Sequence, residues 1–298
     1  YGGTVADLAI PAGLAGQLRN SECAFAITDG SGDSFKPLVI EDNRLYLQRY
    51  WVYENICAEA LGSRARAEPA QPPDDSAIRM LTRLDLDPDQ IAAVRQAVSG
   101  RFCVITGSPG TGKTTIVGVV LALLLQHDAR QTVCLCAPTG KAQARLKEAL
   151  DDEVKNNLTL AADDPARARL ENLSPLTIHR LLKTNPVTGA CGHNRDNPLL
   201  ADTLVVDEVS MVDLPLLVKL LDAIPQGCRL ILLGDKDQLA AVETGAALVE
   251  MCEAWQDRPP VALLTRSHRF PADSGIGRLK DAVNRGAAVE AWEIMSSA

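Results

Sequence analysis

The residues from Gly107 to Thr115 combine three glycines with a lysine and hydroxyl side chains, a pattern suited to binding phosphate. The run Gly-Ser-Pro-Gly-Thr-Gly-Lys-Thr matches G-x-x-x-x-G-K-[ST] at every fixed position. Backbone N–H groups freed by the glycines can surround an anion, and a helix that begins near Lys113 adds the positive end of its dipole. The expected nucleotide-binding residues of the loop are Gly107, Ser108, Pro109, Gly110, Thr111, Gly112, Lys113, Thr114 and Thr115.

The two side chains at the end of this loop, Lys113 and Thr114, are expected to contact ATP and its Mg²⁺. Lys113 is expected to reach the β- and γ-phosphates, and the Thr114 hydroxyl to ligate Mg²⁺. Upstream, Asp87-Pro-Asp-Gln reads as the start of a helix, and its Gln90 is a candidate for reading adenine through its amide. A surface glutamine explains Gln90 about as well from spacing alone.

Two further strand-like runs end in polar residues that suit ATP hydrolysis. The apolar run 203–206 leads into Asp207 and Glu208. Asp207 is expected to hold Mg²⁺ through water, and Glu208 to orient or deprotonate the attacking water. The run 229–234 leads to Gln238, whose neutral amide can sense the γ-phosphate by hydrogen bonding.

Candidate contacts to transition-state charge and to DNA are less specific. Arg269, or failing that Arg266, can stabilise charge as an arginine finger does, although a surface arginine is the alternative for each. Thr139 and Lys141 lie where a strand ends at a helix start, so they are candidates for binding a DNA phosphate. A plain helix N-cap with surface basic residues is an equal alternative.

The elements that must position these residues alternate between strand and helix. A buried strand at 103–106 precedes an apolar helix at 115–125, and apolar strands follow at 132–137, 203–206, 229–233 and 261–264. This alternation predicts an α/β fold, a parallel sheet with helices on both faces and nucleotide at the carboxyl ends of the strands. The charged segment 151–171 is expected to be a surface excursion. The eight scattered cysteines are expected to be buried reduced thiols.

Composition divides the chain into three parts. Residues 1–62 are expected to form a small partner-docking domain, with short strands and a helix at 44–61 that is rich in aromatic residues. Those aromatic residues suit packing better than base stacking, although both remain open. Residues 63–78 read as a linker rich in proline and charge, and residues 79–298 as the nucleotide-binding domain.

Charge and hydropathy exclude some classes of protein. The 298 residues carry a net charge of −8 and 46% hydrophobic residues. This balance excludes a generally basic nucleic-acid surface, so DNA contacts must be local. No apolar run is long enough for a membrane span and no leader pattern is present, so a cytoplasmic protein without a membrane partner is expected. The first residue is Tyr1, so the chain is expected to be part of a longer protein.

In order, the motifs resemble those of superfamily 1 DNA helicases of the RecD branch, the alpha subunits of exonuclease V. The matching blocks are Gly-Ser-Pro-Gly-Thr-Gly-Lys-Thr-Thr, Ala-Pro-Thr-Gly-Lys-Ala, Thr-Ile-His-Arg-Leu-Leu, Val-Asp-Glu-Val-Ser-Met, Leu-Gly-Asp-Lys-Asp-Gln-Leu and Leu-Thr-Arg-Ser-His-Arg-Phe. They correspond to motifs I to IV within residues 80–285. The resemblance implies a RecA-like P-loop NTPase fold. It also strengthens the roles expected for Gln90, Thr139, Lys141, Gln238 and Arg269.

The same resemblance implies ATP-driven 5′→3′ translocation on single-stranded DNA, within a heterotrimer with RecB-like and RecC-like subunits that processes DNA ends during recombinational repair of double-strand breaks. The chain stops at Ala298, before motifs V and VI, so it is expected to bind nucleotide but to hydrolyse it poorly alone. The alternative is a non-motor assembly subunit that has a structural nucleotide site and docks partners through its aromatic N-terminal helix.

Overall fold

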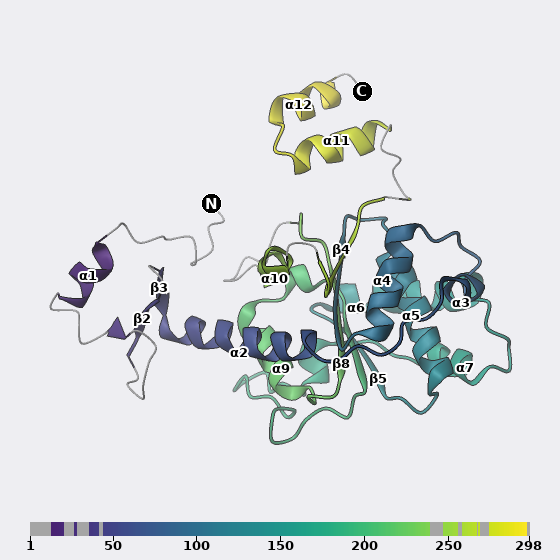
Figure 1. The fold of residues 1–298 in the computed structure, drawn as a ribbon, viewed down its shortest axis with the longest axis horizontal. Helices are drawn as coiled ribbons and strands as arrows, with labels where there is room; N and C mark the ends of the chain where they lie inside the picture. Colours follow the sequence, from purple (N-terminus) through teal and green to yellow (C-terminus); the bar gives the residue numbers. More distant parts are fainter. Residues whose placement is uncertain are drawn as a thin grey trace.

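A six-stranded parallel sheet forms the centre of the protein (Figure 1). The computed structural model describes residues 13–20, 27–28, 36–41, 44–238, 247–255, 258–266, 268 and 274–296. The sheet has the order β6-β5-β7-β8-β4-β9, and every neighbouring pair is parallel. Its strands are β4 (Phe102–Gly107), β5 (Val133–Ala137), β6 (Leu176–Thr177), β7 (Thr203–Val206), β8 (Arg229–Gly234) and β9 (Val261–Leu264). The predicted α/β fold with a parallel sheet is confirmed.

Helices cover both faces of the sheet, and each face has its own apolar core. One core contains residues of α3 (Asp75–Met80), α4 (Pro88–Ser99), α5 (Lys113–His127), α6 (Gly140–Asp152) and α7 (Pro165–Glu171). The other contains residues of α2 (Gln48–Ala65), α8 (Ile178–Leu181), α9 (Leu214–Ala223) and α10 (Ala247–Trp255). Because side chains alternate along a strand, Cys103 and Ile105 enter the first core while Phe102 and Val104 enter the second.

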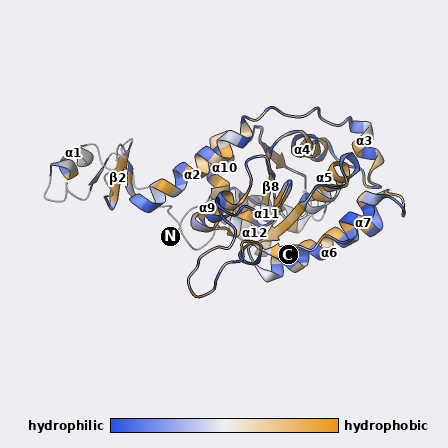
Figure 2. Ribbon diagram, turned by 90° about the horizontal axis from the view of Figure 1, so that it is seen from below, coloured by the Kyte–Doolittle hydropathy of each residue, from blue (hydrophilic) through white to orange (hydrophobic). Residues whose placement is uncertain are grey.

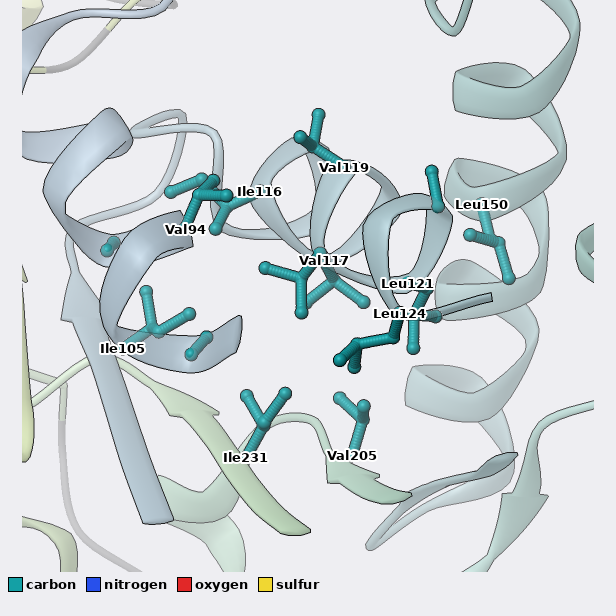
Figure 3. Packing of buried hydrophobic residues seen from close by; sticks show 14 of the residues in the cluster. Val94, Ile105, Ile116, Val117, Val119, Leu121, Leu124, Leu150, Val205 and Ile231 are labelled. Atoms are coloured by element: carbon teal, nitrogen blue, oxygen red, sulfur yellow. The ribbon is translucent and has the colours of Figure 1, made fainter. Parts of the chain in front are cut away.

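Helix α5 is the most deeply buried helix of the first core. Val117 and Leu121 of α5 face Val205 and Ile231, which come from the sheet (Figure 3). Leu121 is fully buried. The helix needs no polar face because other helices and the sheet surround it, which explains its almost uniformly apolar sequence. This burial fixes the helix start, and therefore the phosphate-binding loop, against β4.

The N-terminal part differs from the expected pattern at one element. Residues Arg44–Leu47 form strand β3 rather than the start of a helix, and they pair antiparallel with β2 (Leu38–Glu41). The pairing buries Val39, Ile40 and Tyr46, which a helix beginning at residue 44 would leave without partners. A short β1 (Ile27–Thr28) and α1 (Leu14–Arg19) complete the described N-terminal elements. One of the short strands expected in residues 1–62 covers residues 23–28, and residues 23–26 of it lie outside the described residues.

Helix α2 then runs from this small sheet to the main body (Figure 1). It crosses the division expected at residue 62, and its Cys57 and Leu61 belong to the second core. Arg64, near its end, donates hydrogen bonds to the backbone oxygens of Ile224 and Pro225. The division of the chain into domains stays a prediction, but α2 is packed onto the nucleotide-binding body.

The segment expected as a surface excursion, 151–171, is instead part of the first core. A π-helix at Glu153–Asn157 follows α6, and Leu158, Leu160 and Leu170 are buried. Charged residues are frequent in the segment's sequence, but its spaced apolar residues, with Val154 and Ala166 beside the leucines, reach the core. Figure 2 shows α6 and α7 alternating between hydrophilic and hydrophobic residues, as expected for helices with one buried face.

Two helices lie near the C-terminus, α11 (Gly275–Asn284) and α12 (Ala288–Ser296), and they pack on each other. Among the described residues, no helix is both long and apolar enough to cross a membrane.

Candidate nucleotide-binding site

The loop between β4 and α5 has the backbone geometry of a phosphate cradle. Gly110 and Gly112 adopt φ of 84° and 85°, a left-handed conformation that favours glycine. At Gly107, a Cβ atom would lie 2.8 Å from the backbone oxygen of Leu264. The Thr111 hydroxyl donates to the backbone oxygen of Ser108 at 2.9 Å and closes the loop. The sequence pattern therefore corresponds to steric requirements at each glycine.

Lys113, the first residue of α5, folds back over the loop. Its Nζ donates to the backbone oxygen of Gly107 at 2.6 Å and lies 3.4 Å from that of Ser108. Burial lowers the pKa of Lys113, while the carboxylates of Asp235, Glu208 and Asp207 act in the opposite direction. The ammonium group is thus held at the loop and surrounded by carboxylates, where an anionic phosphate would bring a second favourable partner.

Asp207 and Glu208 lie at the carboxyl end of β7, as predicted. The backbone N–H of Asp207 donates to Cys136 of β5 at 2.9 Å, and that of Glu208 donates to the Asp207 carboxylate at 2.9 Å. Glu208 has φ of 54°, so the chain turns sharply away from the strand at this residue. Burial, aided by the nearby Glu208 carboxylate, raises the pKa of Asp207 to about 6, against the opposing effects of the hydrogen bond from the Glu208 backbone and of the Lys113 ammonium group. A cation beside Asp207 would relieve that destabilised charge.

Gln238 is joined to this acidic pair through a neighbouring serine. The Ser210 hydroxyl donates to Oε1 of Gln238 at 3.2 Å, and Ser210 lies two residues after Glu208 in a short 3₁₀ helix, Val209–Met211. Gln238 itself follows β8 and its backbone N–H donates to the Asp235 oxygen at 3.2 Å. The two motifs that end β7 and β8 are therefore connected directly.

Gln90 is buried beside the loop, so the surface alternative is wrong. Its backbone N–H donates to Asp87, and its Oε1 accepts from the Asp87 backbone, a reciprocal cap of α4. Its Nε2 donates to the backbone oxygen of Thr111 at 3.0 Å and lies 3.2 Å from Nε2 of His268. His268 is also 3.3 Å from the Asp87 carboxylate. The helix cap and the phosphate loop thus share one side chain.

One cavity of about 910 Å³ brings most of the predicted residues together. Its lining includes Gln90, Pro109, Gly110, Gly112, Lys113, Thr114, Thr115, Asp207, Glu208 and Gln238. Gly107, Ser108 and Thr111 belong to the loop but do not line the cavity. The volume is within the range of small-molecule sites.

The donor set of this cavity fits Mg²⁺ bound together with a nucleotide. A hydroxyl at Thr114 and a carboxylate at Asp207 are oxygen ligands, and Mg²⁺ takes its other ligands from water and substrate phosphates. The described residues contain no cluster of three or more metal-ligating side chains.

Among the other predicted residues, Thr139, Lys141 and Arg266 do not line the cavity. Thr139 caps α6 by accepting from the backbone N–H of Ala142 at 3.2 Å, so the N-cap alternative describes its local role. Lys141 is exposed in the first turn of the same helix. Arg269 lies outside the described residues, and the exposed Arg266 does not line the cavity.

The sequence motifs did not indicate the cavity wall opposite the loop. Arg145, Asp152 and Glu153 line the cavity from α6 and the π-helix. Glu153 is 7% exposed and accepts hydrogen bonds from the Thr115 hydroxyl at 2.5 Å and from Asn157 at 2.9 Å. Arg145 has no hydrogen-bond or ion-pair partner among the described residues. In the sequence, Arg145 could have been noticed only because it lies one helical turn after the Thr139-Gly140-Lys141 run.

Comparison with known proteins agrees with this geometry. A family model described as an AAA domain matches residues 90–244. The RecBCD enzyme subunit RecD of Mycobacterium tuberculosis is 43% identical over 83% of this chain and 42% of its own length. RecD of Haemophilus influenzae is 38% identical over 69% of this chain and 36% of its own length. The ATP-dependent RecD2 DNA helicase of Deinococcus radiodurans is 32% identical over 84% of this chain and 31% of its own length.

The chain thus spans less than half the length of these relatives. The matched residues run from Gln90 through the phosphate loop and the Asp207–Glu208 pair to just beyond Gln238. These are the residues that the cavity collects. The chain belongs to the AAA domain family, among RecD-like superfamily 1 helicases.

Proposed function

We propose that this chain is the nucleotide-binding part of an ATP-dependent DNA helicase subunit, which moves 5′→3′ along single-stranded DNA in a RecBCD-type enzyme. One observation carries the proposal: Lys113, Asp207, Glu208, Gln238 and the phosphate loop converge on a single cavity. The relatives' names as RecBCD enzyme subunits and as an ATP-dependent DNA helicase support it. RecB-like and RecC-like subunits and DNA ends are the proposed partners, and the cytoplasm is the proposed location.

Binding begins with Lys113. Its Nζ bonds the Gly107 and Ser108 carbonyl oxygens, so the ammonium group is already positioned at the mouth of the loop. Exchange of these neutral acceptors for β- and γ-phosphate oxygens gives stronger, charge-assisted hydrogen bonds. The left-handed Gly110 and Gly112 keep the loop open for the anion. Gln90 at the same loop is proposed to read the adenine base.

Hydrolysis requires a water molecule to attack the γ-phosphate. Glu208, at the sharp turn after β7, is proposed to accept a proton from this water and orient it. Thr114 and Asp207 are proposed to hold Mg²⁺, which supplies charge neutralisation for the phosphates when it is bound. Gln238 is proposed to sense the γ-phosphate and to transmit its presence to the β7 end through Ser210. Arg269 is proposed to stabilise transition-state charge.

Helix α6 provides a physical connection between DNA and nucleotide. Its first turn carries Thr139 and Lys141, which are proposed to contact a DNA phosphate, and its later turns line the nucleotide cavity at Arg145. The helix also packs on α5 in the first core. A shift of α6 on nucleotide binding therefore moves the DNA-contacting end as well, because a helix transmits displacement as a rigid unit.

Glu208→Gln in the full-length protein tests whether the subunit is a DNA motor or only takes part in assembly of the complex. The substitution removes the proton acceptor but keeps the shape, so DNA unwinding by the assembled complex should be abolished while subunit assembly and ATP binding persist. Glu148→Gln, an exposed change on α6, is the matched control and should unwind normally. Unwinding that survives in Glu208→Gln would favour a subunit that only assembles.

A further inference from the structure

A second cavity lies at the opposite end of β4 from the phosphate loop. Its volume is about 720 Å³, within the range of small-molecule sites. It lies between the end of α2, the segment 66–74, α4 and the Pro259–Pro260 turn before β9. Phe102, the first residue of β4, lines this second cavity. The nucleotide cavity begins beyond Gly107, which is the last residue of β4. The two cavities share no lining residue.

The lining of this cavity combines apolar surface with positive charge. Ile91, Phe102 and several alanines and prolines contribute the apolar part. The charged residues are Arg64, Arg79, Arg95 and Arg101 against the single Asp75. The whole chain has a net charge of −8, and the nucleotide cavity has more acidic than basic side chains. This concentration of arginine is therefore a local feature with the charge expected for an anion site.

The wall also contains donor groups that the fold leaves without good acceptors. Among the described residues, the buried side-chain nitrogens without a hydrogen-bond partner are Nε of Arg64 and Nε2 of Gln96, and both residues line this cavity. Arg64 is 6% exposed. The Cys103 thiol, a weak acceptor, lies near the Gln96 side chain. Both nitrogens are sealed from solvent, so an anion in the cavity would stabilise the Arg64 charge through space rather than by a hydrogen bond to either atom.

We propose that this cavity binds a carboxylate carried on an apolar body, with the carboxylate paired to Arg79, Arg95 or Arg101 and the body against Ile91 and Phe102. Guanidinium groups bind carboxylates through paired, charge-assisted hydrogen bonds. Arg95 now pairs with Asp75 at 3.2 Å, and both side chains are about half exposed, so an entering carboxylate can replace that partner. A free aromatic or aliphatic acid and an acidic peptide segment offer the same chemistry.

One wall of the cavity is an irregular segment without helix or strand. Segment 66–74, which contributes Ala67 and Pro69 to the lining, is tied to the body by a hydrogen bond from the Ala70 N–H to the Ser99 oxygen at 2.9 Å. An occupant would hold this segment, and with it the end of α2, against α4. Binding would therefore change the protection of segment 66–74 against hydrogen exchange, a local readout that does not require ATP.

Ligand-detected NMR on this chain tests the proposal with two pairs of probes. The first pair is 3-phenylpropionate and 3-phenylpropionamide. The second is the blocked peptides acetyl-Asp-Phe-Asp-amide and acetyl-Asn-Phe-Asn-amide. The acid of either pair should bind about tenfold more tightly than its neutral analogue, because one charge-assisted hydrogen bond is worth that much. Preference for the free acid or for the peptide identifies the source of the carboxylate.

Two variants and one control locate the site. Arg95→Ala should weaken binding of the acid several-fold, and Ala92→Trp, which fills the cavity from the exposed side of α4, should abolish it. Arg195→Ala, which removes a comparable surface ion pair with Asp222 at 3.3 Å, should have no effect. Saturating ATP should leave probe binding unchanged. Failure of both acids to bind, equal binding of the neutral analogues, or affinity for the acid that neither Arg95→Ala nor Ala92→Trp lowers would overturn the proposal.

Discussion

Gly112→Ala is the substitution whose consequences the structure defines most closely. Gly112 has φ of 85°, and a Cβ atom at this position would lie 2.5 Å from Nε2 of Gln90. That nitrogen donates to Thr111 and contacts His268, so the added methyl group displaces a bonded, buried amide. The change therefore strains the backbone of the loop and separates Gln90 from it.

The two effects have different magnitudes and can be separated. The left-handed conformation costs an alanine roughly 1–2 kcal/mol. Displacement of the Gln90 amide loses one or two hydrogen bonds, each worth about 1 kcal/mol. We expect Gly112→Ala to lower the free energy of unfolding by about 2–4 kcal/mol. Gly189→Ala is the control, because Gly189 has φ of 69° with nothing within 4 Å of a Cβ, and it should lose only the backbone part.

Urea unfolding of Gly112→Ala, Gln90→Ala and the double variant measures the clash itself. Because Gln90→Ala removes the displaced amide, the double variant should be about 1–2 kcal/mol more stable than the sum of the single changes predicts. Nucleotide affinity should fall in Gly112→Ala and stay normal in Gly189→Ala. Additive free energies in the cycle would refute the reasoning, because they would mean that Gln90 and the loop are energetically independent.

Three further predictions concern the wall opposite the loop and the cores. Glu153→Ala removes the hydrogen-bond acceptor of the Thr115 hydroxyl, so it should lower the free energy of unfolding in urea by about 1–3 kcal/mol. It should also weaken nucleotide binding in a fluorescence titration. The control Glu148→Ala should change neither quantity. Arg145→Ala should raise the Kd for ATP more than that for adenosine, because a cation facing the cavity acts on phosphate; equal changes would contradict this. Burial raises the pKa of Cys57, Cys103 and Cys228 to about 12, so at pH 8 iodoacetamide should modify them only after unfolding, as mass spectrometry would show; rapid labelling of native Cys103 would contradict its burial.

The central site follows from the sequence because parallel strands end at one edge of a sheet. Lys113 follows β4, Asp207 follows β7 and Gln238 follows β8, and these three strands are neighbours in the order β7-β8-β4. Each motif is local in sequence, and each strand is mostly apolar and buried along nearly its whole length. The fold therefore brings together residues that the pattern could already assign to nucleotide chemistry.

The parts that the sequence did not predict depend on tertiary contacts. Glu153 belongs to a charged stretch, and only the packing of the π-helix against α5 turns its carboxylate toward Thr115. Arg44–Leu47 is a strand because β2 offers it a partner, although the following residues are helical. The contact of Gln90 with His268 joins residues 178 positions apart. No local periodicity contains that information.

Titration of this chain with a fluorescent ATP analogue and Mg²⁺ tests the central claim most directly. Lys113→Ala removes the ammonium group held at the phosphate loop, so it should reduce affinity for the nucleotide by at least about tenfold, equivalent to one charge-assisted contact. Lys147→Ala, which removes an exposed ion pair with Asp151 on the outer part of α6, should bind like the unaltered chain. Equal affinities for all three proteins would contradict the assignment of this cavity to ATP.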